Sequence, residues 1–351
     1  MAWASGQKLY GDRYIIEKKL GEGGLGVTYL AKDKKGNRVV IKTLKDEIFS
    51  RPNVNWYQEK FFQEAVQLAV FRHANIVRIE NVFKQEQLPC IVMDYIEGED
   101  LEKLVLKRGV LSEVEALHYI RQIGEALTVV HEKGLLHRDI KPSNIMVRSA
   151  NYEAILIDFG LARGFIPDFT QQLTVGLTHG FAPPEQYYQE GRWGEYTDVY
   201  ALAATLYYLL TKTNPIAAPI RALNAPFKQP KEINSSLSSK VNQAIWQGMA
   251  LEATKRPPTI QQWLELLSIT THTVQTPLQS TRGMSNDAAT LYCPNCQAAN
   301  PLTNKFCQQC STPLPQRYLW VVEDVSGVGS PGDLLAGRYL IINPSVVLEG
   351  V

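Results

Sequence analysis

Short apolar runs of strand length dominate the chain between Tyr14 and about Tyr95. They are rich in β-branched and aromatic residues and are separated by Gly, Asn, Asp or Lys: RYIIEKKL, VTYLAKD, RVVIKTL, IVRIENVFK and CIVMDY. Runs of this kind predict β-strands. One helix is expected among them, between Glu59 and Arg72. Its apolar stripe consists of Phe61, Ala65 and Leu68, which recur at i, i+4 and i+7.

The periodicity becomes helical from Leu101 to about Ile269. Ser112 with Glu115 forms a capping box, which marks the start of a long helix. The apolar residues of that helix recur three and four positions apart: Leu117, Ile120, Ile123, Leu127 and Val130.

Two more segments of this region predict helices. Val199–Leu210 is mostly apolar and suits a buried helix, but it is shorter than the roughly 18 apolar residues of a membrane span. Thr259, with Gln262 three positions on, caps a last helix. The pattern therefore predicts an α+β protein, in which a small β-rich lobe and a large helical lobe meet near Asp94–Gly98.

The composition is that of a globular protein. Of the 351 residues, 45% are hydrophobic and 20% are charged, and 36 Lys and Arg against 35 Asp and Glu give a net charge of +1. Such a balance provides no global field to attract nucleic acid or an anionic membrane. Because the first residues lack a basic segment followed by an apolar signal core, we expect a cytoplasmic protein whose cysteines are reduced or bind metal.

The helical region is followed by stretches of different composition. A segment rich in Ser, Thr and Gln is typical of a flexible linker, and it precedes a cluster of four cysteines. The last residues contain strand-like runs but too little chain for a core. They fit a truncated further domain and an arm that folds onto another part of the protein equally well. We expect an N-terminal tail (residues 1–10) and a two-lobed domain (11–268, with lobes 11–95 and 96–268). A linker (269–290), a cysteine module (291–315) and a C-terminal tail (316–351) follow.

A glycine-rich G-x-G-x-x-G pattern connects the first two strands. In a dinucleotide-binding turn this pattern would open a helix, but here strands flank it on both sides. A loop of glycines lets backbone N–H groups approach nucleotide phosphates without obstruction. The residues of the loop are Gly21, Glu22, Gly23, Gly24, Leu25 and Gly26.

Two charged residues accompany this loop. Lys42 ends the run V-V-I-K and can neutralise the α- and β-phosphates, and Glu64 on the following helix is the candidate to hold the lysine extended. Taken singly, each is equally consistent with a solvated surface charge.

Two further motifs lie downstream. H-R-D-I-K-P-S-N occupies positions 137–144, and D-F-G begins at Asp158. With the glycine loop, the V-V-I-K lysine, P-P-E at 183–185, Asp198 and Arg256 in the same order, residues 11–268 resemble the eukaryotic-like protein kinases of the bacterial Ser/Thr type. The resemblance implies the two-lobed protein kinase fold.

The resemblance also implies an ATP site with catalytic and metal-binding residues. Asp139 would orient the substrate hydroxyl and accept its proton, while Lys141 would steady the γ-phosphate. Asn144 and Asp158 would hold Mg²⁺, which Mn²⁺ could replace. A lysine at 141 followed by Asn144 resembles Ser/Thr kinases rather than tyrosine kinases. His137 is expected to be a packed residue rather than a general base.

Adenine is expected to bind beneath the glycine loop, next to the segment that joins the lobes. Met93 takes the gatekeeper position, and the following residues form the hinge. Two departures from the family, Thr28 for Val and Val40 for Ala, narrow or polarise this pocket. The nucleotide-binding residues implied are the six of the glycine loop with Val27, Thr28, Val40, Lys42, Met93, Asp94, Tyr95, Ile96 and Met146.

The segment between D-F-G and P-P-E has the features of an activation segment. Glu185 is expected to form a buried ion pair with Arg256, and the Thr178 hydroxyl to bridge Asp139 and Lys141. A phosphate on Thr170 or Thr174 would neutralise Arg138. The alternative is that both are ordinary loop threonines.

Four of the five cysteines have the spacing C-x₂-C-x₁₀-C-x₂-C: Cys293, Cys296, Cys307 and Cys310. Paired C-x-x-C turns predict a closed, tetrahedral structural Zn²⁺ site, and the segment resembles a zinc ribbon. Two disulfides or a redox pair are the alternatives, which the missing secretion signal disfavours. Basic and aromatic residues are sparse around the cluster, so a docking or regulatory role is expected rather than nucleic-acid binding. Cys90 is expected to be a buried hydrophobe.

The function expected from the sequence is that of a cytoplasmic protein Ser/Thr kinase. It would transfer the γ-phosphate of Mg²⁺·ATP to Ser or Thr hydroxyls of proteins, phosphorylate itself, and act in signal transduction, with a docking partner on the zinc ribbon. The alternative is a catalytically silent, nucleotide-binding scaffold that recruits partners through the ribbon.

Overall fold

A computed structural model describes most of the chain, in two compact units that comprise Met1–Thr271 and His272–Val351. The described residues are 3–23, 26–50, 54–158, 180–188, 191–267, 290–293, 296, 298–301, 307–310, 319–321 and 339–341.

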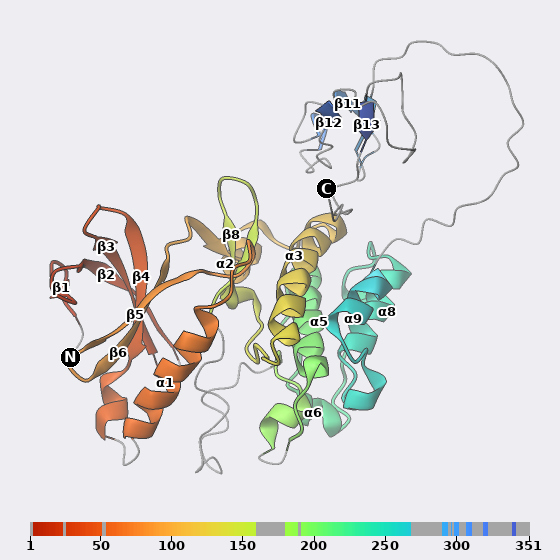
Figure 1. The fold of residues 1–351 in the computed structure, drawn as a ribbon. Coiled ribbons are helices and arrows are strands. Elements are labelled where there is room, and N and C mark those ends of the chain that lie inside the picture. The colour runs from red at the N-terminus through yellow and green to blue at the C-terminus, as the bar shows by residue number, and fades with distance from the viewer. Residues whose placement is uncertain are drawn as a thin grey trace, which may run out of the picture. The chain divides into compact units, whose positions relative to one another are not determined.

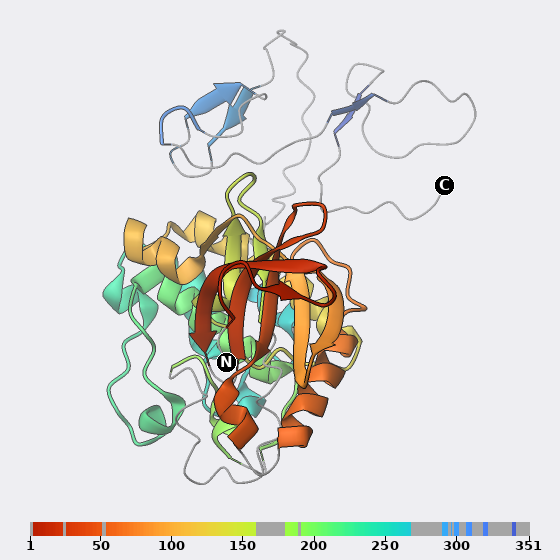
Figure 2. The same ribbon diagram turned by 90° about the vertical axis from the view of Figure 1, so that its left-hand side faces the viewer.

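The small lobe of the first unit contains a six-stranded antiparallel sheet (Figures 1 and 2). In sheet order, its strands are β1 (Lys8–Leu9), β2 (Tyr14–Gly23), β3 (Gly26–Asp33), β4 (Arg38–Leu44), β6 (Leu88–Asp94) and β5 (Ile79–Gln85). The helix α1 (Val54–Leu68) contacts β5 and β6, and a 3₁₀ turn, η1 (Asp46–Ser50), precedes it. The helix begins before the expected Glu59 because buried Tyr57 extends the apolar stripe by one turn.

Alternation along the strands divides the apolar side chains between two clusters. In β6, Ile91 and Met93 belong to the large central core, whereas Cys90 and Val92 belong to a second cluster on the opposite face. That second cluster also contains Trp3 from the first ten residues, which were expected to form a tail. The burial of Cys90 agrees with its expected role as a hydrophobe, and burial raises the pKa of its thiol to about 12.

The large lobe is mainly helical, as expected. Ser112 Oγ accepts a hydrogen bond from Glu115 N (3.2 Å) at the start of α3, and Thr259 Oγ1 accepts one from Gln262 N (3.2 Å) before α9. The helices are α2 (Leu101–Arg108), α3 (Glu113–Glu132), α5 (Glu195–Thr211), α6 (Ala218–Ala222), α7 (Pro230–Ile233), α8 (Ser239–Gly248) and α9 (Ile260–Leu267), with 3₁₀ turns η2 (Pro142–Asn144), η3 (Pro184–Tyr187) and η4 (Ala253–Lys255).

Helix α5 lies at the centre of this lobe. All its residues from Thr197 to Thr211 are buried, and it contacts α3, α8 and α9 (Figure 1). Because it is buried on every side, the segment is a core helix. None of the described helices combines the length and the hydropathy that crossing a bilayer requires.

A small three-stranded sheet links the two lobes. It consists of β7 (Gly98–Asp100), β8 (Ile145–Arg148) and β9 (Ala154–Leu156). Val77 N donates to Leu156 O (3.0 Å), and Leu156 N donates to Asn75 O (2.8 Å). This connection brings the residues after β8 and β9 toward the small lobe. The α+β, two-lobed fold expected from the sequence is confirmed.

The second unit contains two short antiparallel ladders among its described residues. The strands β10 (Thr290–Tyr292) and β11 (Ala299–Pro301) pair around the first cysteine loop, and β12 (Leu319–Val321) pairs with β13 (Tyr339–Ile341) in the C-terminal tail.

Candidate active site

Lys42 of β4 and Asp158, which are distant in sequence, form an ion pair. Lys42 Nζ donates to Asp158 Oδ1 at 2.6 Å. Burial opposes the charge on Asp158, but the ammonium group of Lys42 prevails and holds the pKa of this carboxyl below its usual value. The backbone of Asp158 is in the left-handed region (φ 53°), a conformation that a non-glycine residue adopts at a cost and that is common at functional sites. The side chain of Glu64, the expected partner of Lys42, lies outside the described residues.

Asp139, Lys141 and Asn144 are gathered in the loop before β8. Asn144 Nδ2 donates to Asp139 O (2.8 Å) and to Asp139 Oδ2 (2.9 Å), and Lys141 Nζ lies 3.3 Å from the same carboxylate oxygen. Ile157 N, one residue before Asp158, donates to Asn144 O at 2.9 Å. A carboxylate, a cation and an amide are thus joined by hydrogen bonds to the segment that carries Asp158.

Asp198 of α5 anchors the start of this loop. Its carboxylate accepts hydrogen bonds from the backbone N–H groups of His137 (2.8 Å) and Arg138 (2.9 Å), and it lies 2.8 Å from His131 Nε2. Asp198 is fully buried; burial opposes its charge, but these groups outweigh the effect and lower its pKa. The same contacts hold Arg138 in a left-handed conformation (φ 62°).

His131 was missed in the sequence analysis. It lies near the end of α3, six positions before His137, and its Nδ1 is 3.3 Å from Glu195 Oε2. A histidine within an otherwise apolar buried stripe was the available signal. By contrast, burial lowers the pKa of His137, whose Nδ1 accepts a hydrogen bond from Asp139 N (3.2 Å), consistent with a packed, neutral ring.

The residues expected around adenine come from both lobes. Val40 pairs with Met93 across β4 and β6, and Thr28 pairs with Lys42 across β3 and β4. Val40 and Met146 pack against the core that contains Met93 and Ile96. Asp94 and Tyr95 are half-buried beside them.

The strands β2 and β3 carry the described glycines of the loop. Gly21 pairs with Thr28, and Gly23 with Gly26. A Cβ on Gly26 would lie only 3.1 Å from Thr43 O, which is tighter than an ordinary van der Waals contact. Gly24 and Leu25 lie outside the described residues, as do Phe159, Gly160 and the threonines at 170, 174 and 178.

Glu185 and Arg256 form a bidentate ion pair with Nη1–Oε1 and Nη2–Oε2 distances of 2.7 and 3.0 Å. The Arg256 side chain is fully buried, and its remaining N–H groups donate to the carbonyls of Ala250, Tyr196 and Leu251. Thr197 Oγ1 donates to Glu185 Oε1 at 3.0 Å. The charges are therefore compensated and hydrogen-bonded, as burial requires.

A second contact of this region reaches the loop that carries Asp139. The guanidinium carbon of Arg138 lies 4.5 Å from the centre of the Trp193 ring, a cation–π arrangement. Trp193 Nε1 donates to Glu185 O (3.1 Å), and Gln186 Nε2 donates to Arg138 O (2.9 Å). The roles of Trp193 and Gln186 were not predicted from the sequence, because nothing in their local pattern points to Arg138.

The profile of the protein kinase domain family matches residues 14–267. The chain belongs to this family. One curated relative, a probable serine/threonine-protein kinase of Clostridium perfringens, is 29% identical over 73% of this chain and 38% of its own length. A second, from Clostridium acetobutylicum, is 32% identical over 67% of this chain and 36% of its own length. Serine/threonine-protein kinase B of Synechocystis is 30% identical over 79% of this chain and 51% of its own length. The chain therefore spans between about a third and a half of the length of these relatives.

Solved kinase structures resemble the same part of the chain. PpkA-294 in its apo form is 26% identical and covers 76% of this chain and 99% of its own, with a TM-score of 0.67. The PknI kinase domain of Mycobacterium tuberculosis is 21% identical over 76% of this chain and 98% of its own, with a TM-score of 0.61, and supports the fold alone. The kinase fold is thus confirmed, and family membership implies the use of ATP with Mg²⁺.

The kinase domain offers donors that fit this cofactor. Carboxylate and amide oxygens, as on Asp158 and Asn144, are the ligands that Mg²⁺ prefers, and an ammonium group such as Lys42 suits a phosphate.

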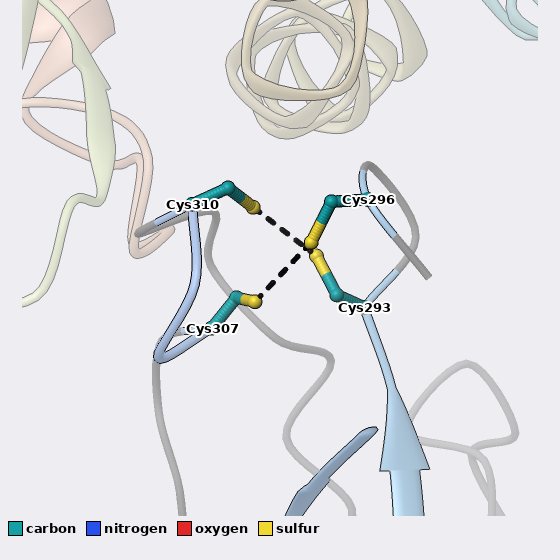
Figure 3. Close-up of side chains that lie close together, drawn as sticks. All are labelled: Cys293, Cys296, Cys307 and Cys310. Carbon is teal, nitrogen blue, oxygen red and sulfur yellow. Dashed lines mark hydrogen bonds between the residues drawn. The ribbon is translucent and has the colours of Figure 1, made fainter. Parts of the chain in front are cut away.

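The four clustered cysteines of the second unit converge on one point (Figure 3). All four sulfur atoms lie within 4.8 Å of one another, and the Sγ–Sγ distances are 3.5 Å for both Cys293–Cys310 and Cys296–Cys307. A Zn–S bond of about 2.3 Å places tetrahedral sulfurs roughly 3.8 Å apart. No cysteine of the described residues takes part in a disulfide.

Proposed function

We propose that the protein is an ATP-dependent protein serine/threonine kinase that also phosphorylates itself and acts in signal transduction. The observation that carries this proposal is the connected set formed by Lys42, Asp158, Asn144, Asp139 and Lys141. It supplies two cations, two oxygen ligands and a carboxylate base from segments far apart in sequence. Its protein substrates follow from the family and belong to the same proposal.

Each residue of this set has a proposed role. Lys42 binds the α- and β-phosphates, with Glu64 as its partner, and Asp158 and Asn144 hold Mg²⁺. The bound metal, Mg²⁺ or Mn²⁺, neutralises charge on the β- and γ-phosphates. Asp139 accepts a hydrogen bond from the substrate hydroxyl and then its proton, while Lys141 stabilises negative charge on the transferred group.

The remaining nucleotide contacts come from the glycine loop and the hinge. Backbone N–H groups between Gly21 and Gly26 bind phosphate oxygens, Val27, Thr28, Val40 and Met146 enclose the adenine, and the backbone of residues 94–96 reads its edge. No observation on the described residues favours the alternative of a catalytically silent scaffold, since all of the described motif positions carry residues able to perform the reaction.

The decisive experiment compares Asp139→Asn with the wild-type protein in Mg²⁺ and ATP. We expect phosphate transfer to the protein itself and to a generic substrate to fall by about 10²–10⁴-fold, while ATP binding persists. Asp12→Asn is the matched control, because Asp12 is exposed and pairs only locally with Lys8. Equal incorporation by wild type and Asp139→Asn would refute kinase activity.

We also propose that Cys293, Cys296, Cys307 and Cys310 bind a structural Zn²⁺ in a zinc ribbon. The convergence of their sulfur atoms supports this, and four thiolates leave no open position for catalysis. Metal analysis should find close to one zinc per chain. Replacing Cys293 and Cys296 by Ser should remove it, whereas Cys90→Ser should not.

Three further expectations belong to this proposal. The division into tails, kinase domain, linker and ribbon remains a prediction from the sequence, except that Trp3 and β1 pack in the small lobe. The cytoplasmic location also remains a prediction. The ribbon is proposed to dock a protein partner rather than nucleic acid, on the grounds of its sparse basic and aromatic residues.

A further inference from the structure

Asn300 lies on β11, between the two cysteine loops. The residue is only 1% exposed, although it belongs to a short module in which the described apolar side chains are few. A buried amide is costly unless its donors and acceptor are satisfied. The contacts of Asn300 therefore indicate what it is retained for.

The amide nitrogen of Asn300 reaches the first cysteine loop and a sulfur of the second. Asn300 Nδ2 donates to Ala298 O at 2.7 Å and to Cys307 Sγ at 3.5 Å. Ala298 O also accepts a hydrogen bond from Cys293 N at 2.9 Å. One carbonyl therefore joins Asn300 to the backbone of the first metal-binding cysteine.

The amide oxygen of Asn300 reaches the second cysteine loop. Asn300 Oδ1 accepts a hydrogen bond from Gln308 N at 2.9 Å, next to Cys307 in the chain. Gln309 N donates to Cys307 Sγ at 3.4 Å. The Cys307 sulfur thus receives two N–H donors, one from a side chain and one from the backbone.

These contacts join the two loops that Figure 3 shows facing each other. A zinc-bound cysteine is a thiolate, and N–H donors to its sulfur both orient it and stabilise its charge. Any non-proline residue at position 309 would supply the backbone N–H that donates to Cys307 Sγ. The link between the two loops through Oδ1 and Nδ2, by contrast, requires an amide side chain at position 300.

We propose that Asn300 is the positioning residue of the zinc site, holding the Cys293 and Cys307 loops in register and donating to the Cys307 thiolate. The inference rests on the proposed zinc site and adds a fifth residue to its four ligands.

The test measures zinc affinity in the full chain by competition with a chromophoric chelator, and records the cobalt spectrum. Asn300→Ala removes both links, and we expect zinc affinity to fall about 10–100-fold. Asn300→Asp keeps the acceptor for Gln308 N but loses the donor to sulfur and adds a negative charge beside the thiolates. We expect it to lose at least as much.

The matched control is Gln308→Ala. Its side chain is exposed and the hydrogen bond to Asn300 comes from its backbone, so zinc affinity should equal that of the wild type. The cobalt spectrum supplies a second readout. Loss of the donor to Cys307 raises the energy of the sulfur electrons, so the sulfur-to-cobalt charge-transfer band should move to longer wavelength in Asn300→Asp and stay unchanged in Gln308→Ala.

The outcomes separate this inference from the proposal on which it rests. If the wild type binds no zinc, the zinc site itself is refuted. If the wild type binds zinc and Asn300→Ala binds it equally well, or if Gln308→Ala loses as much as Asn300→Ala, the positioning role is refuted and the zinc site stands.

Discussion

In the kinase domain the buried side chains form two large apolar clusters, whereas in residues 290–310 the buried side chains described are Cys293, Cys307 and Asn300. The first region gains its stability from apolar area removed from water, and its charged groups are placed where that core can support them. The second has too little chain for such a core, so we propose that its fold depends on zinc bound by the four cysteines. On this proposal the same chain uses two different sources of stability.

Removal of zinc should produce the largest difference between the two regions. The binding free energy of a structural zinc is about 10–16 kcal/mol and is also folding free energy, so a zinc-selective chelator should unfold residues 290–310. Amide hydrogen exchange should then lose protection in that segment alone. The kinase domain should keep its protection and its melting temperature, because no proposed zinc ligand belongs to it.

If residues 290–310 keep their protection from exchange after the chelator has removed the zinc, the module folds without metal. The proposed difference between the two regions would then be wrong. The Cys90→Ala variant is the control for loss of a cysteine, and it should respond to the chelator as the wild type does.

Removal of a buried charge from the kinase domain should have a smaller effect on stability. Glu185→Gln leaves the fully buried Arg256 without its carboxylate, which should lower the free energy of unfolding of the kinase domain by about 3–5 kcal/mol in urea titrations. Lys255→Met is the matched control. Its ion pair with Glu252 is exposed, so its loss should cost less than about 1 kcal/mol.

The double variant Glu185→Gln, Arg256→Met sharpens the point. Removing both charges should cost less than the sum of the single changes, because neither partner is left uncompensated. Additive losses would show that the two side chains do not act as a pair.

The smallest effect concerns His131 and depends on pH. Burial opposes its charge, but Asp198 and Glu195, both on α5, outweigh burial and raise its pKa above the ordinary 6.5. The protonated form is thus favoured by folding. Its contribution is complete below about pH 6.5 and is lost as the pH rises through the folded-state pKa.

The measurement is the free energy of unfolding of wild type and His131→Gln between about pH 5 and 8. The advantage of the wild type should shrink as the pH rises. His118→Gln is the control, because burial lowers the pKa of His118 and its contribution should change in the opposite sense. A constant difference for His131→Gln would mean that His131 acts without its charge.

Much of the site was accessible from the sequence because its residues belong to short motifs. Asp139, Lys141 and Asn144 lie within six positions of one another, so the local backbone alone brings them together. The strand and helix pattern likewise predicted both lobes and the two N-caps at Ser112 and Thr259. The start of α1 was misplaced because its first buried residue, Tyr57, precedes the regular stripe.

Contacts between segments far apart in the chain were not accessible in this way. No sequence pattern predicts three of these contacts: the Arg138–Trp193 stack, the bridge from His131 to Asp198 and the links made by Asn300. Each side chain belongs to a segment that reads as ordinary helix, loop or strand. Its partner is chosen only when those segments pack.

By itself, the sequence determined the order of the motifs, the division between strand and helix, and the spacing of the four cysteines, since these depend on neighbours along the chain. The tertiary structure decided that Lys42 meets Asp158 and that Asp198 binds the backbone of His137. It confirmed the Glu185–Arg256 pair, which the resemblance had already implied. The physical reason is that a buried charge or amide requires a partner, and in a folded chain that partner is supplied by whichever segment packs against it.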